Sequence, residues 1–263
     1  PNPCVRCNNH LKFDMLVQRA REIEADWLAT GHYARLMRDG AGRPRLFKGK
    51  DEKKDQSYFL AGTPPEALGM LSFPLGGRTK AEVRDCAERL RVRTSGKPDS
   101  QDVCFIPGGD TEAFLRRQGG DAPPGDIVDE SGAVLGRHRG VHGYTIGQRR
   151  GIGVAAPEPL YVKRIDAANR RLVVATADRL YVSELHAADW NWLRRPAPEE
   201  SVYARVRYRA SASRVAKIHE GEALRLELSE AAHAVASGQA IALYGGEGAT
   251  ELLGGGRLVL PEG

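Results

Sequence analysis

The chain has 263 residues and a formal net charge of +5, from 39 Lys and Arg against 34 Asp and Glu. This length exceeds that of one typical domain and predicts two or three domains. No apolar run approaches the length that spans a bilayer, and the 30 glycines follow no collagen-like period, so the composition argues against membrane-spanning and fibrous classes. The modest charge permits a nucleic-acid partner without requiring one.

Positive charge and cysteines are both unevenly distributed. Residues 137–217 hold 16 Lys and Arg against seven Asp and Glu, which fits either an RNA-binding surface or a solvated basic face. Four cysteines are too few for a disulfide scaffold. Their spacing predicts a reducing compartment where thiols do chemistry or bind metal, and we expect a cytoplasmic protein.

The first elements predict an α/β sheet. Two prolines within Pro1–Asn8 favour an irregular turn. A helix should follow, because four apolar residues recur at helical spacing, namely Phe13, Leu16, Ala20 and Ile23. Trp27–Thr30 then predicts a short buried strand that delivers Gly31 and His32 to a loop. Ligands of α/β sheets bind beyond such carboxyl ends of strands.

A second helix should begin at Thr79, where Thr79-Lys80-Ala81-Glu82 has the pattern of a capping box. Val83, Cys86 and Leu90 would share its inner face. We therefore expect Cys86 to be a small core residue rather than a reactive thiol.

Beyond Gly108 short apolar runs alternate with turn residues. Residues 127–135 predict a β-hairpin around Asp129-Glu130-Ser131-Gly132. Val202–Tyr208 alternates at period two, as do Leu224, Leu226 and Leu228, and Ala240–Tyr244 predicts another strand. Several short strands at this spacing indicate a small β-barrel at the end of the chain.

Three cysteines form the first chemical motif. Cys4 and Cys7 make a C-x-x-C, and Cys104 lies far along the chain. Half a zinc site lacks its matching pair of ligands, and a thioredoxin-type dithiol would open a helix without flanking prolines. A nucleophile or cluster site closed by Cys104 is the third interpretation.

Other motifs combine cations with aromatic residues and glycines. Lys54–Leu60 places a cation, a carboxylate, an amide and a hydroxyl before an apolar anchor, which also suits a helix N-terminus capped by Asp55. Gly143–Gly153 surrounds two arginines with glycines, a pattern for phosphate or for a plain basic hairpin. Arg205, Arg207 and Arg209 recur at period two beside tyrosines, as in surfaces that bind nucleic acid.

Taken in order, these segments resemble the MnmA-type tRNA 2-thiouridylases. The resemblance runs through the whole chain and rests on five segments: Asn2-Pro3-Cys4-Val5-Arg6-Cys7-Asn8, Ala29-Thr30-Gly31-His32-Tyr33, Lys54-Asp55-Gln56-Ser57-Tyr58-Phe59-Leu60, Asp99-Ser100-Gln101-Asp102-Val103-Cys104-Phe105-Ile106 and Gly143-Tyr144-Thr145-Ile146-Gly147-Gln148-Arg149-Arg150-Gly151.

The resemblance implies a Rossmann-like PP-loop ATP pyrophosphatase domain, a small central domain and a C-terminal β-barrel that binds tRNA. We expect these at residues 1–108, 109–180 and 181–263. The family's Ser-Gly-Gly-x-Asp-Ser phosphate loop does not occur in the sequence and is expected upstream of Pro1. The chain holds the remainder of that domain together with the central domain and the β-barrel. Without the phosphate loop, it is expected to be inactive on its own.

The activity that the resemblance implies is ATP-dependent 2-thiolation of the wobble uridine of tRNA, with Mg²⁺. Cys7 is expected as the nucleophile and Cys104 as the persulfide, which a cysteine desulfurase or a sulfur-relay protein would supply. The remaining assignments are Gly31 for ATP; Asn2, Pro3 and Cys4 for the target base; and, for tRNA, His32, Lys54, Asp55, Gln56, Arg207, Tyr208 and Gln239.

Cys4 is a departure, because some family members carry Asp there and the acid is assigned a catalytic role. A thiol replaces a carboxylate as a base only with a depressed pKa. Cys4, Cys7 and Cys104 could instead hold three irons of a [4Fe–4S] cluster whose fourth iron binds sulfide. The sequence leaves both the persulfide relay and the cluster open.

Two other functions fit parts of the pattern. A PP-loop ligase acting on a small molecule would need neither an arginine-lined barrel nor paired thiols. A non-catalytic RNA-binding module is compatible with a chain that lacks the phosphate loop. A Ser-Gly-Gly-x-Asp-Ser segment in the gene upstream of Pro1 would separate an enzyme from a bare module.

Overall fold

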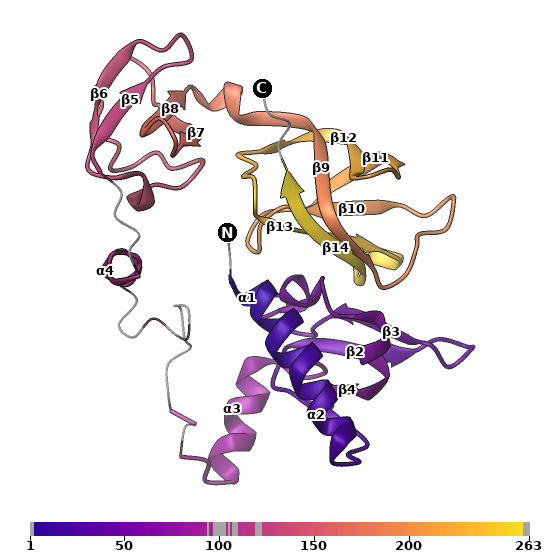
Figure 1. Cartoon of the computed structure of the whole chain (residues 1–263). Helices are drawn as coiled ribbons and strands as arrows, with labels where there is room; N and C mark the ends of the chain where they lie inside the picture. Colours follow the sequence, from indigo (N-terminus) through magenta and orange to yellow (C-terminus); the bar gives the residue numbers. More distant parts are fainter. Residues whose placement is uncertain are drawn as a thin grey trace. The chain divides into compact units, whose positions relative to one another are not determined.

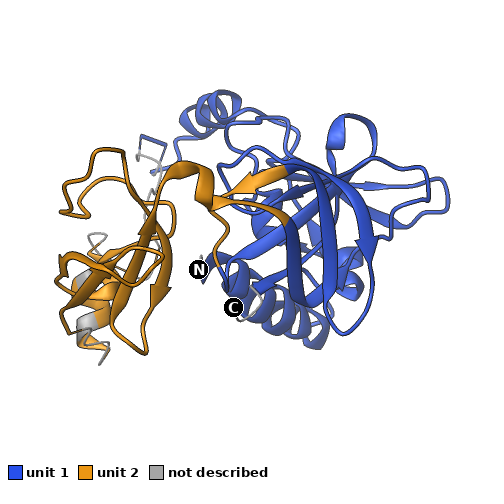
Figure 2. Cartoon of the chain, turned by 90° about the horizontal axis from the view of Figure 1, so that it is seen from above, with its two compact units in different colours: residues 1–99, 184–230, 237–263 blue, residues 100–183, 231–236 orange. Residues whose placement is uncertain are grey.

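The computed structural model describes residues 3–93, 95–96, 104, 106, 110–118 and 123–259. The chain divides into two compact units (Figure 2). Unit 1 consists of residues 1–99, 184–230 and 237–263, and unit 2 of residues 100–183 and 231–236. No helix in the described part of the chain is long and apolar enough to cross a membrane.

Unit 1 begins with one continuous helical rod, made of α1 (Pro3–Arg6), the π-helical segment η1 (Cys7–Met15) and α2 (Leu16–Glu22) (Figure 1). The predicted irregular turn over Pro1–Asn8 is therefore wrong from Pro3 onward. Proline is tolerated in the first turn of a helix, because the amide that it lacks would have no partner there.

The buried face of this rod differs in part from the predicted one. Phe13 and Ala20 are buried as expected, but Leu16 and Ile23 are 47% and 62% exposed, and Val17 packs inward instead. Hydrogen bonds from i to i+5 in η1 take up about one more residue per turn than an α-helix. This shifts the phase of the helix before α2 begins, which a constant 3.6-residue period does not anticipate.

The expected strand–loop arrangement is present. β1 (Leu28–Ala29) pairs in parallel with β4 (Leu71–Ser72), so that Gly31 and His32 follow the carboxyl end of β1. Parallel pairing next to a helix confirms the α/β class of this part of the chain. The strand is shorter and less buried than predicted, since Ala29 is exposed.

Helix α3 (Lys80–Arg89) begins as predicted, with Thr79 and Glu82 forming a capping box. Its predicted inner face is wrong, because α3 contains no buried residue, Cys86 is half-buried and Leu90 is largely exposed. The helix is held at its first turn instead, where its backbone and side chains bind the loop before residue 55. Periodicity alone does not show whether a neighbouring element covers an apolar face.

The C-terminal strands of unit 1 form the predicted barrel. Six strands of the described chain close on themselves in the order β13-β10-β11-β12-β9-β14, with β14 pairing back to β13. Their bounds are β9 (Tyr181–Trp192), β10 (Val202–Arg205), β11 (Ser213–His219), β12 (Leu224–His233), β13 (Ala240–Gly245) and β14 (Glu251–Val259), with η7 (Glu247–Ala249) between the last two.

Two predictions about these strands have different outcomes. Leu224, Leu226 and Leu228 are all buried, as their period-two spacing on β12 indicates. β10 ends at Arg205, however, and the chain then turns, with the Ala210 amide donating to the Arg207 carbonyl at 3.2 Å. The predicted strand up to residue 208 is thus wrong, and no single strand face presents the arginines at 205, 207 and 209. The alternation of residue types in Val202–Tyr208 continues beyond the last hydrogen bond between β10 and its neighbouring strands.

A hairpin joins the α/β part to the barrel within unit 1. β2 (Ala34–Arg38) pairs with β3 (Pro44–Lys48), and β3 extends the barrel sheet at the register Glu251↔Phe47 (Figure 1). The chain then enters a segment that we call the bridging turn, residues 57–63, which opens with η2 (Ser57–Leu60) and is followed by η3 (Pro65–Met70).

One apolar core runs through all of these elements. It includes residues of the helical rod, of the bridging turn and of the barrel, among them Val5, Phe13, Tyr58, Leu60, Tyr244 and Leu252. Because the rod and the barrel share this core, unit 1 holds them as one packed body. Burial of such side chains contributes roughly 1.5–3 kcal/mol each.

Unit 2 contains a four-stranded sheet in the order β6-β5-β8-β7. The predicted hairpin is confirmed, because β5 (Gly125–Val128) and β6 (Val134–His138) pair antiparallel. The Asp129 carboxylate accepts hydrogen bonds from the amides of Ser131 and Ala133 in the connecting turn. The other elements are α4 (Thr111–Arg117), η5 (Val141–Gly143), β7 (Tyr161–Asp166), β8 (Arg171–Ala175) and η6 (Ala177–Leu180).

An ion-pair network ties the β2–β3 hairpin to the barrel. Glu251 accepts from Arg45 at 2.5 and 2.8 Å and from Arg194 at 2.8 and 2.9 Å. Arg194 also binds Glu200 at 2.6 and 2.7 Å, and Arg45 reaches Asp39 at 3.2 Å. The Arg194 hydrogen bonds lower the pKa of Glu200 to about 2, and the Arg43 amide lowers that of Asp39 to about 2.

Acid should weaken this network over a defined range. Both folded pKa values lie below the ordinary values of 4.5 and 3.8, so their stabilisation is present above pH about 4.5 and is lost as the pH falls toward about 2. We expect Glu200→Gln to lower the Tm at neutral pH, and its difference from the wild type to shrink as the pH approaches 2. Glu199→Gln, at an exposed neighbour, is the matched control. A Glu200→Gln deficit that stays constant from pH 7 to pH 2 would contradict the account.

Candidate functional site

Cys4 and Cys7 lie near the start of the helical rod. Both are half-buried, and none of the four cysteines forms a disulfide in this structure. Pro3 is half-buried in the first turn, whereas Asn2 lies outside the described residues. Cys104 is exposed and belongs to unit 2, while Cys7 belongs to unit 1.

The described residues offer no ready metal centre. Among them, no three Cys, His, Asp or Glu side chains gather in a way that could hold an ion. Unit 1 supplies two thiols, Cys4 and Cys7, and the third ligand that the cluster alternative requires, Cys104, belongs to unit 2, so the cluster stays a prediction. We therefore derive no chemical step through a cluster.

A buried carboxylate organises the bridging turn. Asp55 is 2% exposed, and its oxygens accept from the Gly49 amide at 3.1 Å, the Ser57 amide at 3.0 Å and the Ser57 hydroxyl at 3.0 Å. Arg205 of β10 lies 3.6 Å away as its counter-charge. The Ser57 hydroxyl also lies 3.0 Å from the hydroxyl of Tyr244 in β13. Asp55 thus fastens the turn to the barrel from inside the molecule.

Aromatic rings continue this contact toward the surface. The Tyr208 ring lies 4.5 Å from that of Phe59 and 6.2 Å from that of Tyr58, centroid to centroid. The Tyr58 hydroxyl donates to the Ala240 carbonyl at 2.7 Å, and it also has a hydrogen bond with the Gln239 side chain. The bridging turn therefore brings together Tyr208 and Gln239, which are far apart in sequence.

Positive charge is concentrated around the same rings. Burial raises the pKa of Tyr208, and so does the Asp55 charge, against the opposing charges of Arg209, Lys54 and Arg205. Lys48 lies over the Tyr244 ring at 4.6 Å, and both burial and the Arg205 charge lower its pKa. Burial likewise lowers the pKa of Arg207. A partly desolvated group of cations with one internal carboxylate suits an anionic ligand such as an RNA backbone.

Gln56 and Arg205 serve the scaffold in this structure. The Gln56 side-chain oxygen accepts from the Tyr33 backbone amide at 3.0 Å, and the Gln56 backbone amide donates to the Tyr33 carbonyl at 2.9 Å. The Arg205 side chain is 20% exposed and faces Asp55. Lys54, Arg207, Tyr208 and Gln239 are half-buried around the same rings.

Gly31 and His32 form a separate part of the site. His32 is buried between the rings of Phe13 and Phe73, at 5.9 and 6.0 Å, and its Nδ1 lies 2.8 Å from the Thr30 hydroxyl. Burial lowers its pKa to about 4, with the Lys12 charge adding to the effect, so that the ring is neutral at pH 7. Since Phe13 lies in η1, His32 contacts the helical segment that begins with Cys7. A Cβ at Gly31 would meet only Leu75 at 3.7 Å, which leaves its backbone accessible.

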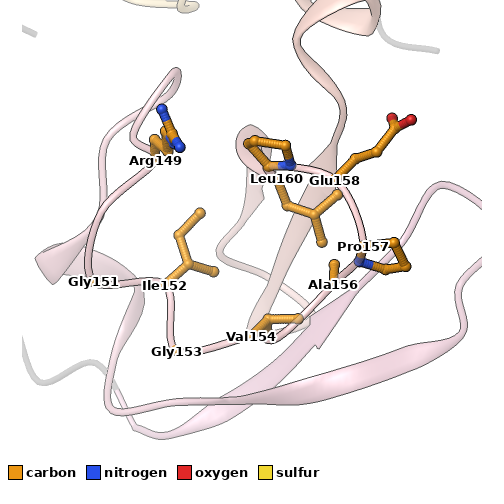
Figure 3. Close-up of a pocket in the computed structure, with 10 residues that line it drawn as sticks. Arg149, Gly151, Ile152, Gly153, Val154, Ala156, Pro157, Glu158 and Leu160 are labelled. Carbon is orange, nitrogen blue, oxygen red and sulfur yellow. The ribbon is translucent and has the colours of Figure 1, made fainter.

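The glycine- and arginine-rich motif forms an irregular loop of unit 2. Gln148 shapes it, because its side chain accepts from the Thr145 amide at 3.0 Å and donates to the Arg150 carbonyl at 2.9 Å. A cavity of about 400 Å³ lies beside this loop, and Arg149, Ile152 and Leu160 are among the residues that line it (Figure 3). Both arginines are exposed and have no ion-pair partner in the described part of the chain.

Asn8 is the functional candidate that sequence reasoning missed. It directly follows Cys7, is 3% exposed and donates to the Phe59 carbonyl at 3.0 Å. A polar residue at a buried helical position would have pointed to Asn8. The prediction of an irregular turn over Pro1–Asn8 placed no helix there, so this position was not recognised.

Comparisons with known proteins agree along the whole chain. Residues 1–108 match the family model described as the tRNA methyl transferase HUP domain, residues 112–176 its PRC-barrel domain, and residues 182–258 the aminomethyltransferase beta-barrel domain. The tRNA-specific 2-thiouridylase MnmA of Geobacter metallireducens is 44% identical over 259 residues, which cover 97% of this chain and 70% of that protein. The namesake proteins of Geotalea uraniireducens and Magnetococcus marinus are 44% and 43% identical, over 97% and 98% of this chain and 68% and 73% of theirs.

Removing the counter-charge of Asp55 should destabilise unit 1. We expect Arg205→Ala to lower the free energy of unfolding by roughly 1–3 kcal/mol, because it leaves a buried carboxylate without its cation. Arg214→Ala, on an exposed position of β11, should change it by less than about 0.5 kcal/mol. Denaturant titration measures both. Equal values for the two variants would show that the Asp55–Arg205 pair contributes no stability.

Proposed function

Because the chain belongs to the MnmA family of tRNA-specific 2-thiouridylases, we propose that it carries out ATP-dependent 2-thiolation of the wobble uridine of tRNA. The observation that carries the proposal is the arrangement of unit 1. There, the helical rod that carries Cys7 and the cationic, aromatic surface around Tyr208 pack against the same bridging turn. A nucleophile and an RNA-binding surface on one packed body are what sulfur transfer to a tRNA base requires.

The reaction begins with activation of the base. The C2 carbonyl of uridine is unreactive, so its oxygen must first become a leaving group. Attack of this oxygen on the α-phosphate of ATP forms the adenylated base and releases pyrophosphate. Gly31, with an open backbone beyond the end of β1, would border the nucleotide, and Mg²⁺ bound to ATP would balance phosphate charge.

Sulfur transfer then follows in two steps. The terminal sulfur of a Cys104 persulfide attacks C2 and displaces AMP, which leaves the base joined to Cys104 through a disulfide. The Cys7 thiolate attacks the Cys104 sulfur, breaks that bond and releases the 2-thiouridine. The product is a Cys7–Cys104 disulfide, which a two-electron dithiol reductant returns to free thiols. A cysteine desulfurase or a sulfur-relay protein would recharge Cys104.

RNA recognition would use two sets of residues around the bridging turn, one that contacts the RNA and one that supports it. Lys54 and Arg207 would meet phosphates, and Tyr208 and Gln239 would meet the nucleosides, while Asp55 and Gln56 hold this surface in place from behind. Asn2, Pro3 and Cys4 would face the target base, which must leave the anticodon stack at a cost of a few kcal/mol. His32, neutral at pH 7, would support the same region.

The four cysteines should separate clearly in a thiolation assay. We expect Cys7→Ala and Cys104→Ala to reduce 2-thiouridine formation by at least about 10³-fold, because each removes a sulfur from the relay. Cys4→Ala should only slow the reaction, and Cys86→Ala, on α3, is the control that should retain activity. Variants in the full reading frame, expressed in bacteria that lack 2-thiouridine, are scored by mass spectrometry of tRNA nucleosides.

Iron and sulfide measured on the same anaerobically purified proteins distinguish the chemistries. Loss of iron together with activity in Cys4→Ala would favour the cluster over the relay. Normal activity of Cys104→Ala would contradict both.

Arg207 should contribute to tRNA binding mainly through phosphate. We expect Arg207→Ala to weaken binding and to reduce the slope of log Kd against log salt by about one. Arg38→Ala, on an exposed position in the β2–β3 hairpin, should leave the slope unchanged. Filter binding of unmodified tRNA at several salt concentrations measures the slopes. Indistinguishable slopes for Arg207→Ala and the wild type would show that Arg207 belongs to a solvated basic face and makes no phosphate contact.

A further inference from the structure

We propose that Asn8 is a positioning residue that fixes the Cys7 thiol to the RNA-binding surface through the bridging turn. The role of Cys7 rests on the function proposed above, but the attachment itself follows from the contacts of unit 1. Asn8 has no part in the chemistry described so far, although it is one of the few buried polar side chains among the described residues.

The first side of the attachment lies on the helical rod. The Asn8 Nδ2 donates to the Phe59 carbonyl at 3.0 Å. The Asn9 amide, in the orientation that satisfies both of its ends, donates to the carbonyls of Gly62 at 3.2 Å and Val5 at 3.0 Å. A Cβ at Gly62 would overlap the Asn9 side chain, so only glycine allows this approach. Two successive asparagines therefore fasten the residues after Cys7 to the bridging turn.

The second side of the attachment lies on the barrel. Asn191 of β9 donates to the Thr63 carbonyl at 2.8 Å and to that of Ala61 at 3.4 Å. A Cβ at Gly255 of β14 would overlap Ala61, so the turn lies directly against the barrel backbone there. The Phe59 ring meanwhile packs on Tyr208 at 4.5 Å. Phe59 thus touches the RNA-binding surface with its ring and Asn8 with its carbonyl.

These contacts give Asn8 a specific consequence for Cys7. The Cys7 thiol is half-buried, so packing of its own side chain fixes it only in part. The next residue, Asn8, is buried and hydrogen-bonded. Without the Asn8 amide, the Phe59 carbonyl loses its side-chain donor, and the start of the rod should open locally more often. Asn191 makes the same type of bond to the same turn, but its side-chain hydrogen bonds reach the turn from the barrel and not from the rod, which makes it a matched control.

The experiment compares Asn8→Ala, Asn8→Asp and Asn191→Ala. Alkylation of each cysteine by iodoacetamide is followed by peptide mass spectrometry, with exposed Cys104 as the internal standard. We expect both Asn8 variants to speed Cys7 alkylation about tenfold, since aspartate keeps the shape but cannot donate the bond. Asn191→Ala should leave the Cys7 rate within about twofold of the wild type.

A kinetic measurement separates positioning from stability alone. In the thiolation assay, the Asn8 variants should lower kcat about tenfold while KM for tRNA stays within about twofold, because the proposed phosphate contacts lie on the cationic surface and not on the rod. Asn191→Ala should match the Asn8 variants in lost Tm but keep kcat. An equal loss of kcat in both would assign Asn8 a structural role only and overturn the proposal.

Failure of the inference and failure of the proposed function give different results. Unchanged Cys7 alkylation in the Asn8 variants, with thiolation still abolished in Cys7→Ala, would overturn the inference alone. Faster alkylation, with thiolation retained in Cys7→Ala, would overturn the proposed function and leave the attachment standing. If the Asn8 variants do not fold, Gly62→Ala, which displaces Asn9, should also speed Cys7 alkylation, and an unchanged rate would count against the proposal.

Discussion

The buried carboxylate of Asp55 is the constraint on which the rest of unit 1 depends. It binds two backbone amides and a hydroxyl within its own segment and forms an ion pair with Arg205 at the end of β10. A buried charge is costly unless it is paired and hydrogen-bonded, so the chain around it is restricted to one arrangement. The bridging turn begins at Ser57, which Asp55 binds. This restriction therefore sets where both the helical rod and the cationic surface around Tyr208 lie.

Adjacent residues of the motif at 54–56 have different roles. Lys54, Asp55 and Gln56 are adjacent in sequence, yet Asp55 and Gln56 hold the scaffold while the Lys54 charge acts on Tyr208. The cationic surface is therefore supported by internal groups of the same segment. Such support keeps cations partly desolvated, which strengthens their interaction with phosphate relative to fully hydrated side chains.

Local rules predicted the elements whose causes are local. The Thr79 capping box, the 127–135 hairpin and the alternation of Leu224, Leu226 and Leu228 each depend on residues within one element. The errors arise where distant contacts decide. The π-helical segment shifts the buried face from Leu16 to Val17, and the buried bond of Asn8 depends on Phe59, 51 residues away. The site residues came from the family resemblance, but their arrangement into support and surface required the fold.

Photo-crosslinking tests most directly whether the helical rod and the barrel surface serve one RNA. An anticodon stem-loop with 4-thiouridine at the wobble position would be irradiated with the protein, and the attached peptides identified by mass spectrometry. If the rod and the barrel surface serve one RNA, crosslinks should fall within residues 3–9 and be lost when unlabelled stem-loop competes. Crosslinks confined to unit 2 or to strands β11 and β12, with none on the rod, would contradict a shared RNA site.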